Sequence, residues 1–453
     1  MCTIAVAMRR TRAEGRQSWL ARRLRGLGAF GRSAVPAIAV AAIGTSSAAL
    51  AASLGPPWVE PGAEPIPSWV TSARILNGDQ PLRIAPAKEA QRRGSGQRDA
   101  LLPVFGAKAG PGCKARWLQV GPFAWVCGEF VELSGKPPLD PTVRTFPEAD
   151  DGMPHRYFFV GADGTQGYKQ LERVDVADPD TTLEAGFAVA VVAEAAHDGD
   201  RYARINTGFW VPMRDLGPVH PFTFHGQEVP EGATAIPFAW VVDDHAKVVG
   251  APTTFGAQVG TRGKFEVVPF VEDAAGGKLL RVGPKEWMLA SEVRHPRVAE
   301  PPVEVDAATG ERWIDVDLTT QTLVAYEGKR PVFATLVSTG KGKPGTPLGT
   351  PLGTHRIWIK LLTTTMDNLE EDNAQRFYRM EDVPWVQFFS KGVGLHGAFW
   401  HRQFGHVRSH GCVNLAPLDA QRLFWWTLPH VPAGWTAASP MTLEPGTIVR
   451  VRQ

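Results

Sequence analysis

The 453-residue sequence has few cysteines, methionines and tyrosines, with four, eight and five of these residues. It also has almost no net charge, because 48 Lys and Arg face 46 Asp and Glu. Basic residues are concentrated only in residues 1–32, which hold eight Arg and one Glu. No later segment shows the concentrated basic stripe that nucleic-acid binding needs, so we expect no nucleic-acid partner.

The sequence also lacks a long apolar run. The apolar stretch 37–43 is flanked by Pro36 and Gly44 and falls short of the roughly 20 apolar residues that span a bilayer. An Arg-rich start, a short apolar stretch and a small-residue end at residues 49–51 are typical of a secretory signal. We therefore expect residues 1–51 to be a cleaved signal peptide, with an uncleaved anchor as the alternative. The protein would then be exported to the periplasm or cell wall and would meet the membrane only during export.

Glycine, proline and tryptophan, in contrast, are plentiful, at 47, 38 and 15 residues. This composition favours many short strands and turns, so we expect a mainly β protein. The 43% of hydrophobic residues is enough for two to four packed domains. Residues 52–71 are rich in proline and are interpreted as a linker.

Three later stretches end alike, in a tryptophan followed by an apolar segment, at Trp125, Trp210 and Trp287. Each follows alternating apolar and polar residues with Gly or Asp turns, the period of half-buried strands. We interpret them as three small β-barrel modules that resemble bacterial SH3-like domains, at residues 72–135, 155–220 and 236–296. Chance recurrence of aromatic strand ends is the alternative.

Two cysteines lie in the first of these modules. Cys113 and Cys127 are close in sequence, and an exported protein meets oxidising conditions. We expect them to form a disulfide. Because Cys2 would be removed with the signal peptide, this would leave Cys412 unpaired. Two reduced core cysteines are the alternative.

The C-terminal domain, residues 312–453, opens with three strand-like runs at 313–318, 322–326 and 332–337, typical of an antiparallel meander. Only residues 418–427 show a clear helical pattern, with Pro417 at the first turn.

Most of the chemistry lies in two motifs of this domain. Leu395-His396-Gly397-Ala398 is followed, ten residues later, by Ser409-His410-Gly411-Cys412-Val413-Asn414. This pair resembles the signature of the YkuD-type L,D-transpeptidases, as do Ser338-Thr339-Gly340 and residues 346–350 upstream. The resemblance implies a YkuD-type β-sandwich with one or two helices.

A nucleophilic thiol needs a base beside it, because a free cysteine is mostly protonated at neutral pH. Cys412 is the candidate nucleophile. By resemblance, His396 is its base and the Gly397 carbonyl orients the imidazole. The amides of His410, Gly411 and Cys412 are expected to face an oxyanion.

Further residues are expected to serve the substrate. Arg408 and Asn414 flank the motif and are candidates to bind a substrate carboxylate or carbonyl, with a role in holding the loop as the alternative for each. Ser409 is a further candidate to bind the substrate. Residues 361–380 lie where the family carries a lid, with a solvated surface helix as the alternative. Asp419 is expected to cap the helix from inside its first turn. The three modules are expected to contribute no residue to the thiol site.

Zinc is a rival interpretation of the four histidines at 396, 401, 406 and 410. We expect no metal, since no helical His pair with an intervening Glu is present. We also expect no organic cofactor. His401 and His406 are interpreted as solvated loop residues.

The resemblance implies a peptidoglycan L,D-transpeptidase. Its partners would be tetrapeptide stems, with glycan or wall contact through the SH3-like modules. The first alternative is an L,D-carboxypeptidase or endopeptidase that uses the same site. The second is an inactive wall-binding scaffold.

Overall fold

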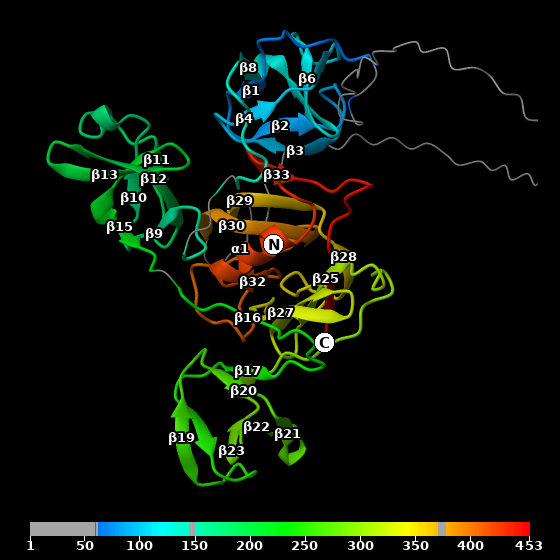
Figure 1. Ribbon diagram of the computed structural model, residues 1–453. Coiled ribbons are helices and arrows are strands. Elements are labelled where there is room, and N and C mark those ends of the chain that lie inside the picture. The colour runs from blue at the N-terminus through cyan, green and yellow to red at the C-terminus, as the bar shows by residue number, and fades with distance from the viewer. Residues whose placement is uncertain (1–58, 60–61, 145, 147–149, 221, 370–376) are drawn as a thin grey trace, which may run out of the picture. The chain divides into compact units, whose positions relative to one another are not determined.

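The computed structural model describes residues 59, 62–144, 146, 150–220, 222–369 and 377–453 (Figure 1). Their regular structure is almost entirely β-strand, with one α-helix and four short 3-10 helices. The prediction of a mainly β protein is confirmed. The expected signal peptide lies outside the described residues, as does much of the linker that follows it. Within the described ranges, no helix is long and apolar enough to cross a membrane.

The first segment pairs strands in the orders β4-β1-β8 and β3-β2-β7-β6-β5. Its elements are β1 (Ser72–Ile75), β2 (Gln80–Arg83), β3 (Arg92–Gly96), β4 (Leu101–Pro103), β5 (Gly106–Lys108), β6 (Trp117–Gly121), β7 (Ala124–Cys127), η1 (Gly128–Phe130) and β8 (Val131–Ser134).

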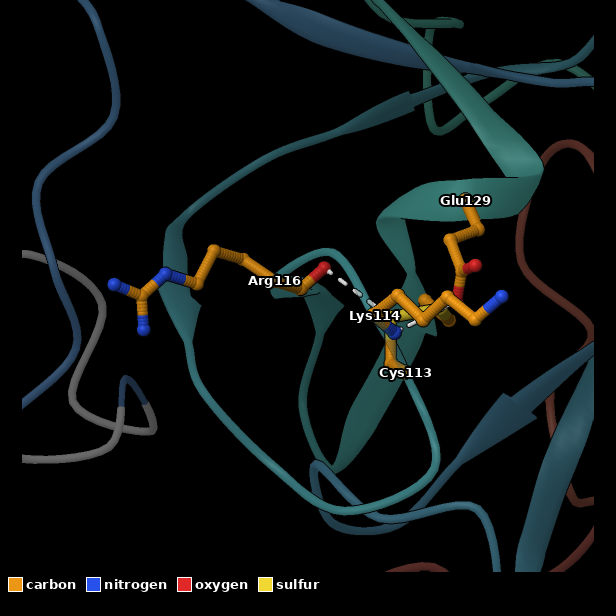
Figure 2. The surroundings of a disulfide bond; sticks show 5 residues. Cys113, Lys114, Arg116 and Glu129 are labelled. Atoms are coloured by element: carbon orange, nitrogen blue, oxygen red, sulfur yellow. Dashed lines mark hydrogen bonds between the residues drawn. A yellow bond between two sulfur atoms is a disulfide. The ribbon is translucent and has the colours of Figure 1, made fainter.

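A disulfide joins Cys113 to Cys127, with the two Cα atoms 5.7 Å apart. Figure 2 shows Glu129 beside it, where the backbone N–H of Lys114 donates to the Glu129 carboxylate over 2.8 Å. The fully buried Trp125 packs against the bridge. A disulfide that closes so short a loop typically stabilises a domain by about 3 kcal/mol.

The second segment has an apolar cluster of its own, drawn from residues between 158 and 216. Its elements are β9 (Arg156–Val160), β10 (Thr165–Gly167), η2 (Leu171–Arg173), β11 (Thr181–Leu183), β12 (Ala188–His197), β13 (Asp200–Ile205), β14 (Trp210–Pro212), η3 (Met213–Asp215) and β15 (Leu216–Pro218).

The third segment also has its own cluster, between residues 239 and 293. Its elements are β17 (Phe238–Val241), β18 (Ala246–Val249), β19 (Gln258–Arg262), β20 (Val267–Pro269), β21 (Glu272–Ala274), η4 (Ala275–Gly277), β22 (Leu279–Gly283), β23 (Glu286–Leu289) and β24 (Val293–Arg294). Each of the three segments is thus built of short strands, and their resemblance to SH3-like domains stays a prediction.

The C-terminal domain contains the remaining elements. They are β25 (Arg312–Asp317), β26 (Thr322–Glu327), β27 (Arg330–Leu336), β28 (Gly353–Arg356), β29 (Ile359–Asp367), β30 (Arg379–Ser390), β31 (Val393–Gly397), β32 (Val413–Leu415), α1 (Pro417–Trp426), β33 (Trp435–Ala438) and β34 (Ile448–Arg452).

The expected meander is present as β25, β26 and β27, which pair antiparallel in a six-stranded sheet of order β16-β27-β26-β25-β34-β28. Strand β16 (Gln227–Glu228) comes from the linker between the second and third segments. The second sheet of this domain contains β29 to β33. Ile314 and Leu323 of the first sheet share one buried cluster with Trp385, Leu395 and Val413 of the second, as in a β-sandwich.

Helix α1 occupies nearly the predicted range, but the expected cap is wrong. The N-cap residue, Ala416, makes no side-chain cap bond. Asp419 is buried and accepts hydrogen bonds from the Gly226 N–H, over 2.8 Å, and from the Thr335 hydroxyl. The Asp419 carboxylate therefore bonds to two partners outside the helix and does not cap it.

The surface-helix alternative for residues 361–380 is also wrong. Residues 359–367 and 379–390 are the strands β29 and β30, paired antiparallel. The hairpin end at 370–376, with most of the acidic residues of this stretch, lies outside the described residues.

The first segment and the C-terminal domain share a sheet, because β3 pairs antiparallel with β33. Gly94 lies opposite Ala438, and a Cβ atom at Gly94 would meet the Ala437 carbonyl oxygen at 2.2 Å. This close backbone approach requires glycine. The apolar cluster of the first segment accordingly continues into that of the C-terminal domain.

Candidate active site

Two parallel strands bring the motif residues together. β31 carries His396 and pairs with β32, so that His396 lies opposite Asn414 and Leu395 opposite Val413. Cys412 directly precedes β32. Paired residues of neighbouring strands share a face, so Asn414 and His396 are directed to the same side of this pair, and Cys412 lies two residues before Asn414.

Cys412 takes part in no disulfide among the described residues, and it is buried. Its side chain has a relative exposure of 6%, and Sγ lies 3.8 Å from the Gly392 carbonyl oxygen. The thiol therefore sits at the start of a strand, in a largely enclosed position.

The His396 imidazole is held in one tautomer. Nδ1 lies 3.2 Å from the carbonyl oxygen of Gly397, which can only accept, so Nδ1 carries the proton. This leaves the Nε2 lone pair for a proton acceptor role. Burial lowers the pKa of His396 to about 4, and the bond to Gly397 opposes this only in part, so the ring is neutral at pH 7.

Gly397 has no room for a side chain. A Cβ atom there would lie 3.0 Å from the Pro384 ring and 3.5 Å from Ala420 of α1. The Trp400 ring also packs against His396, with the two rings stacked at 5.7 Å. The imidazole is thus fixed by packing as well as by its hydrogen bond.

The turn before Cys412 is shaped by Ser409. Its buried hydroxyl donates to the Cys412 carbonyl oxygen and accepts from the Gly411 N–H over 3.1 Å. The Gly411 amide, expected to be an oxyanion donor, is engaged by Ser409 in this structure, and its role toward an oxyanion stays a prediction. Gly411 has φ +125°, a left-handed value that favours glycine.

The two upstream stretches hold this turn by hydrogen bonds. Ser338 exchanges backbone hydrogen bonds with Asn414 over 3.0 and 2.9 Å. The Thr350 hydroxyl donates to the Gly411 carbonyl oxygen over 2.8 Å and accepts from the Gly340 N–H over 2.9 Å. Both upstream stretches that the sequence analysis singled out thus hold the nucleophile's loop.

The interpretation of His401 as a solvated loop residue is wrong. Its Nε2 lies 2.9 Å from the Asn414 side-chain amide, and its ring packs 5.0 Å from that of Phe404. Burial lowers the pKa of His401 to about 3, with smaller contributions from Arg408 and His396. The signal in the sequence was only the short spacing from His396.

His406 is not a solvated loop residue either. Its Nε2 lies 3.3 Å from the carbonyl oxygen of Val242 in the third segment, and its ring is half-buried. His410 is exposed and stacks on Tyr378 at 5.7 Å. In the described ranges, the groups of side chains with metal-ligand spacing do not include these histidines.

Arg408 and Tyr378 lie at the rim of the site. Arg408 is exposed, its backbone N–H donates to Thr339, and its charge acts on His401. Tyr378 begins the return of the β29–β30 hairpin, and its contact with His410 places that hairpin against the nucleophile's loop.

The noncatalytic segments reach the loop between base and nucleophile. The Tyr157 ring of β9 stacks on Phe399 at 4.1 Å, and Phe399 packs edge-on against Trp400 at 5.1 Å. The Arg294 side chain of β24 donates to the Gly405 carbonyl oxygen over 3.0 Å. The second and third segments therefore pack on residues next to the thiol site, which the sequence did not lead us to expect.

Comparison with known proteins gives a family match for this domain. Residues 311–451 match the family model YkuD, the L,D-transpeptidase catalytic domain. No curated protein matches the chain.

Similar solved structures are L,D-transpeptidases. One from Enterococcus faecium is 24% identical over 31% of this chain and 50% of that one, with a TM-score of 0.24. An NMR structure of the E. faecium catalytic domain is 24% identical over 32% of this chain and 98% of that domain, with a TM-score of 0.24. One from Mycobacterium smegmatis is 16% identical over 51% of this chain and all of that one, with a TM-score of 0.25. The chain thus spans half the length of the first of these relatives. Residues 311–451, which include the thiol and the imidazole, thus match the L,D-transpeptidase catalytic domain family YkuD.

Proposed function

We propose that the chain is an exported peptidoglycan L,D-transpeptidase that works through a thioester on Cys412. The observation that carries the proposal is the pair of a buried thiol and a neutral, tautomer-fixed imidazole on adjacent parallel strands. It stands inside a domain that matches the L,D-transpeptidase catalytic family.

The first step transfers an acyl group to sulfur. Sγ of Cys412 attacks the carbonyl carbon of the third residue of a tetrapeptide stem, and Nε2 of His396 takes the thiol proton. The C–N bond to the terminal D-Ala breaks, and His396 returns the proton to the departing amine. A thioester and free D-Ala result.

The second step releases the acyl group to an amine. The amino group of a second stem attacks the thioester carbon, His396 accepts the amine proton, and Sγ leaves and regains a proton. An amide crosslink forms and the thiol is restored. If water attacks instead, the products are a tripeptide stem and the free enzyme, which is the carboxypeptidase alternative.

A neutral thiol–imidazole pair suits this order of events. With its pKa near 4, His396 is neutral at pH 7, so Nε2 carries no proton and can accept one as the sulfur attacks. The amide donors that stabilise the oxyanion would come from the loop at 409–412, in which Ser409 engages the Gly411 N–H.

Mass spectrometry of purified sacculi incubated with the protein tests the proposal. New crosslinks between third residues support transpeptidation, tripeptide stems alone support the hydrolase, and unchanged sacculi support the inactive scaffold. A carbapenem should acylate the wild-type chain once, and Cys412→Ala should show no adduct in intact-protein mass spectrometry. His396→Ala should acylate slowly and recover in part at high pH, where solvent supplies the thiolate.

Wall contact through residues 72–135, 155–220 and 236–296 is part of the same proposal. Export would bring the chain to the periplasm or cell wall, where the disulfide of the first segment persists. Fractionation of cells that produce the full chain tests this location, and recovery in the cytosol would contradict it.

A further inference from the structure

The protonation of His401 is determined by its neighbours. The backbone N–H of Gln403 donates to His401 Nδ1 over 3.2 Å, so Nδ1 offers a lone pair. A neutral imidazole then carries its one proton on Nε2. Burial keeps the ring neutral, as its lowered pKa indicates.

This tautomer determines how the Asn414 amide must be turned. Nδ2 of Asn414 is placed 2.9 Å from Nε2, but Nε2–H is a donor, so the end of the amide that faces it has to be the oxygen. A half-turn about Cβ–Cγ exchanges the two ends of an amide without changing its shape, so hydrogen bonding decides the orientation. The other end of the Asn414 amide is buried and has no hydrogen-bond partner among the described residues. In the orientation that His401 requires, that end is the NH2 group.

The arrangement is tied to the protein by a closed set of hydrogen bonds. Ser338 pairs with the backbone of Asn414, and its hydroxyl donates to the Gln403 carbonyl oxygen over 2.6 Å. Gln403 in turn donates to His401, and the ring of His401 packs on Phe404. The imidazole is therefore held in place as well as in tautomer.

Asn414 lies two residues after the nucleophile and directly opposite His396 in the strand pair. A buried amide donor without a partner destabilises the folded protein, unless a ligand supplies an acceptor. On the proposed function, the ligand that enters here is an acyl donor with several carbonyl oxygens.

We propose that His401 is a positioning residue that turns the Asn414 amide, so that its NH2 group donates to a carbonyl oxygen of the bound peptide donor. The proposal rests on the proposed function for the identity of the ligand. His401 itself touches no reacting atom and acts through Asn414.

The first test compares variants of the two residues by acylation with a stem tetrapeptide. His401→Phe should lower kcat/KM by roughly ten- to a hundredfold, less than the loss of a primary oxyanion donor. His401→Gln keeps an N–H near the place of Nε2 and should stay within about threefold of wild type. Adding His401→Phe to Asn414→Ala should cause no further loss, and additive losses would overturn the proposal.

Asn414→Asp is the matched control for orientation. A carboxylate still accepts from His401 Nε2–H but offers no donor to the substrate. We therefore expect an acylation rate as low as that of Asn414→Ala, together with a thermal stability below that of wild type, because the variant places a carboxylate where the amide is buried. Acylation of Asn414→Asp at the wild-type rate would contradict the proposal.

Alkylation of Cys412 by iodoacetamide separates positioning from a general effect on the thiol. The reagent needs the thiolate but no amide donor, so its rate should be unchanged in His401→Phe. A parallel fall in alkylation would show that His401 acts on the base or on the fold instead.

A readout without turnover keeps this inference separate from the proposed function. Long-range nitrogen–proton NMR correlations of the full chain should show His401 protonated on Nε2. Protonation on Nδ1 would overturn the inference even in an active enzyme. The expected tautomer in a chain that never acylates would reject the proposed function and, with it, the substrate role of the amide.

Discussion

At the scale of single residues, the site depends on two imidazoles that burial keeps uncharged. His396 is 2% exposed and has one hydrogen-bonded partner oxygen to offset its removal from water. The charged form therefore loses more on folding than the neutral form does. The same environment that prepares the base for catalysis makes the folded protein sensitive to acid.

This sensitivity can be measured. The folded-state pKa of His396 is about 4, below its ordinary value, so the unfolded chain binds a proton that the folded chain does not. The resulting stability is fully present above about pH 6.5, and roughly 3 kcal/mol of it is lost as the pH falls to about 4.

Urea unfolding from pH 7 to pH 4 should therefore show a shallower loss of stability in His396→Gln than in wild type. His401 remains in the variant and retains its own contribution. His220→Gln is the control, because His220 is exposed and should leave the profile unchanged. Equal slopes in His396→Gln and wild type would show that His396 does not titrate as described.

At the scale of secondary-structure elements, local sequence patterns predicted several strands and the helix. They did not predict the contacts between distant parts of the chain. The meander, the range of α1 and the two motifs follow from alternation, helix signals and residue order. The partner of Asp419 does not, since Gly226 is 193 residues away in sequence. The pairing of His401 with Asn414 also depends on strand register, which sequence alone does not specify.

Asp419 links α1 to a strand from another part of the chain. Asp419→Ala would leave the Gly226 N–H and the Thr335 hydroxyl without their acceptor, at a cost of about 1 to 3 kcal/mol for each buried group. Amide hydrogen exchange should therefore speed up at residues 224–229, where β16 joins β27.

Asp419→Asn retains one acceptor oxygen, and we expect it to preserve most of the protection at Gly226. Arg450 in β34 lies elsewhere and donates to Asp315, so exchange in β34 should not respond to either Asp419 variant. Unchanged exchange at Gly226 in Asp419→Ala would contradict this account of β16.

At the scale of the whole molecule, the segments before the catalytic domain are in contact with its reactive loop. The second segment touches this loop at Phe399 and the third at Gly405. Tyr157 also donates its hydroxyl hydrogen to the Asp382 carbonyl oxygen over 2.6 Å. A substitution in the second segment should therefore change the rate at which the Cys412 thiol is acylated.

Tyr157→Leu removes the ring that stacks on Phe399 and should lower the rate of Cys412 acylation by about tenfold, because small displacements of reacting groups are costly. Tyr157→Phe loses only the bond to Asp382 and should lose less. Val192→Ala, at an exposed position of β12, is the control. Wild-type acylation by Tyr157→Leu would show that the second segment is only a spacer.

The pairing of β3 with β33 joins residues made early to residues made late. Gly94 and Ala438 are register partners, and the Ser439 N–H donates to the Arg93 carbonyl oxygen over 2.8 Å. Until β33 has been synthesised, the edge of β3 has no pairing strand. An unpaired strand edge readily pairs with other chains. Strand β33 therefore covers an edge that the earlier segment exposes until residues 435–438 are made, and a nascent chain halted before β33 would leave that edge open to pairing with other chains.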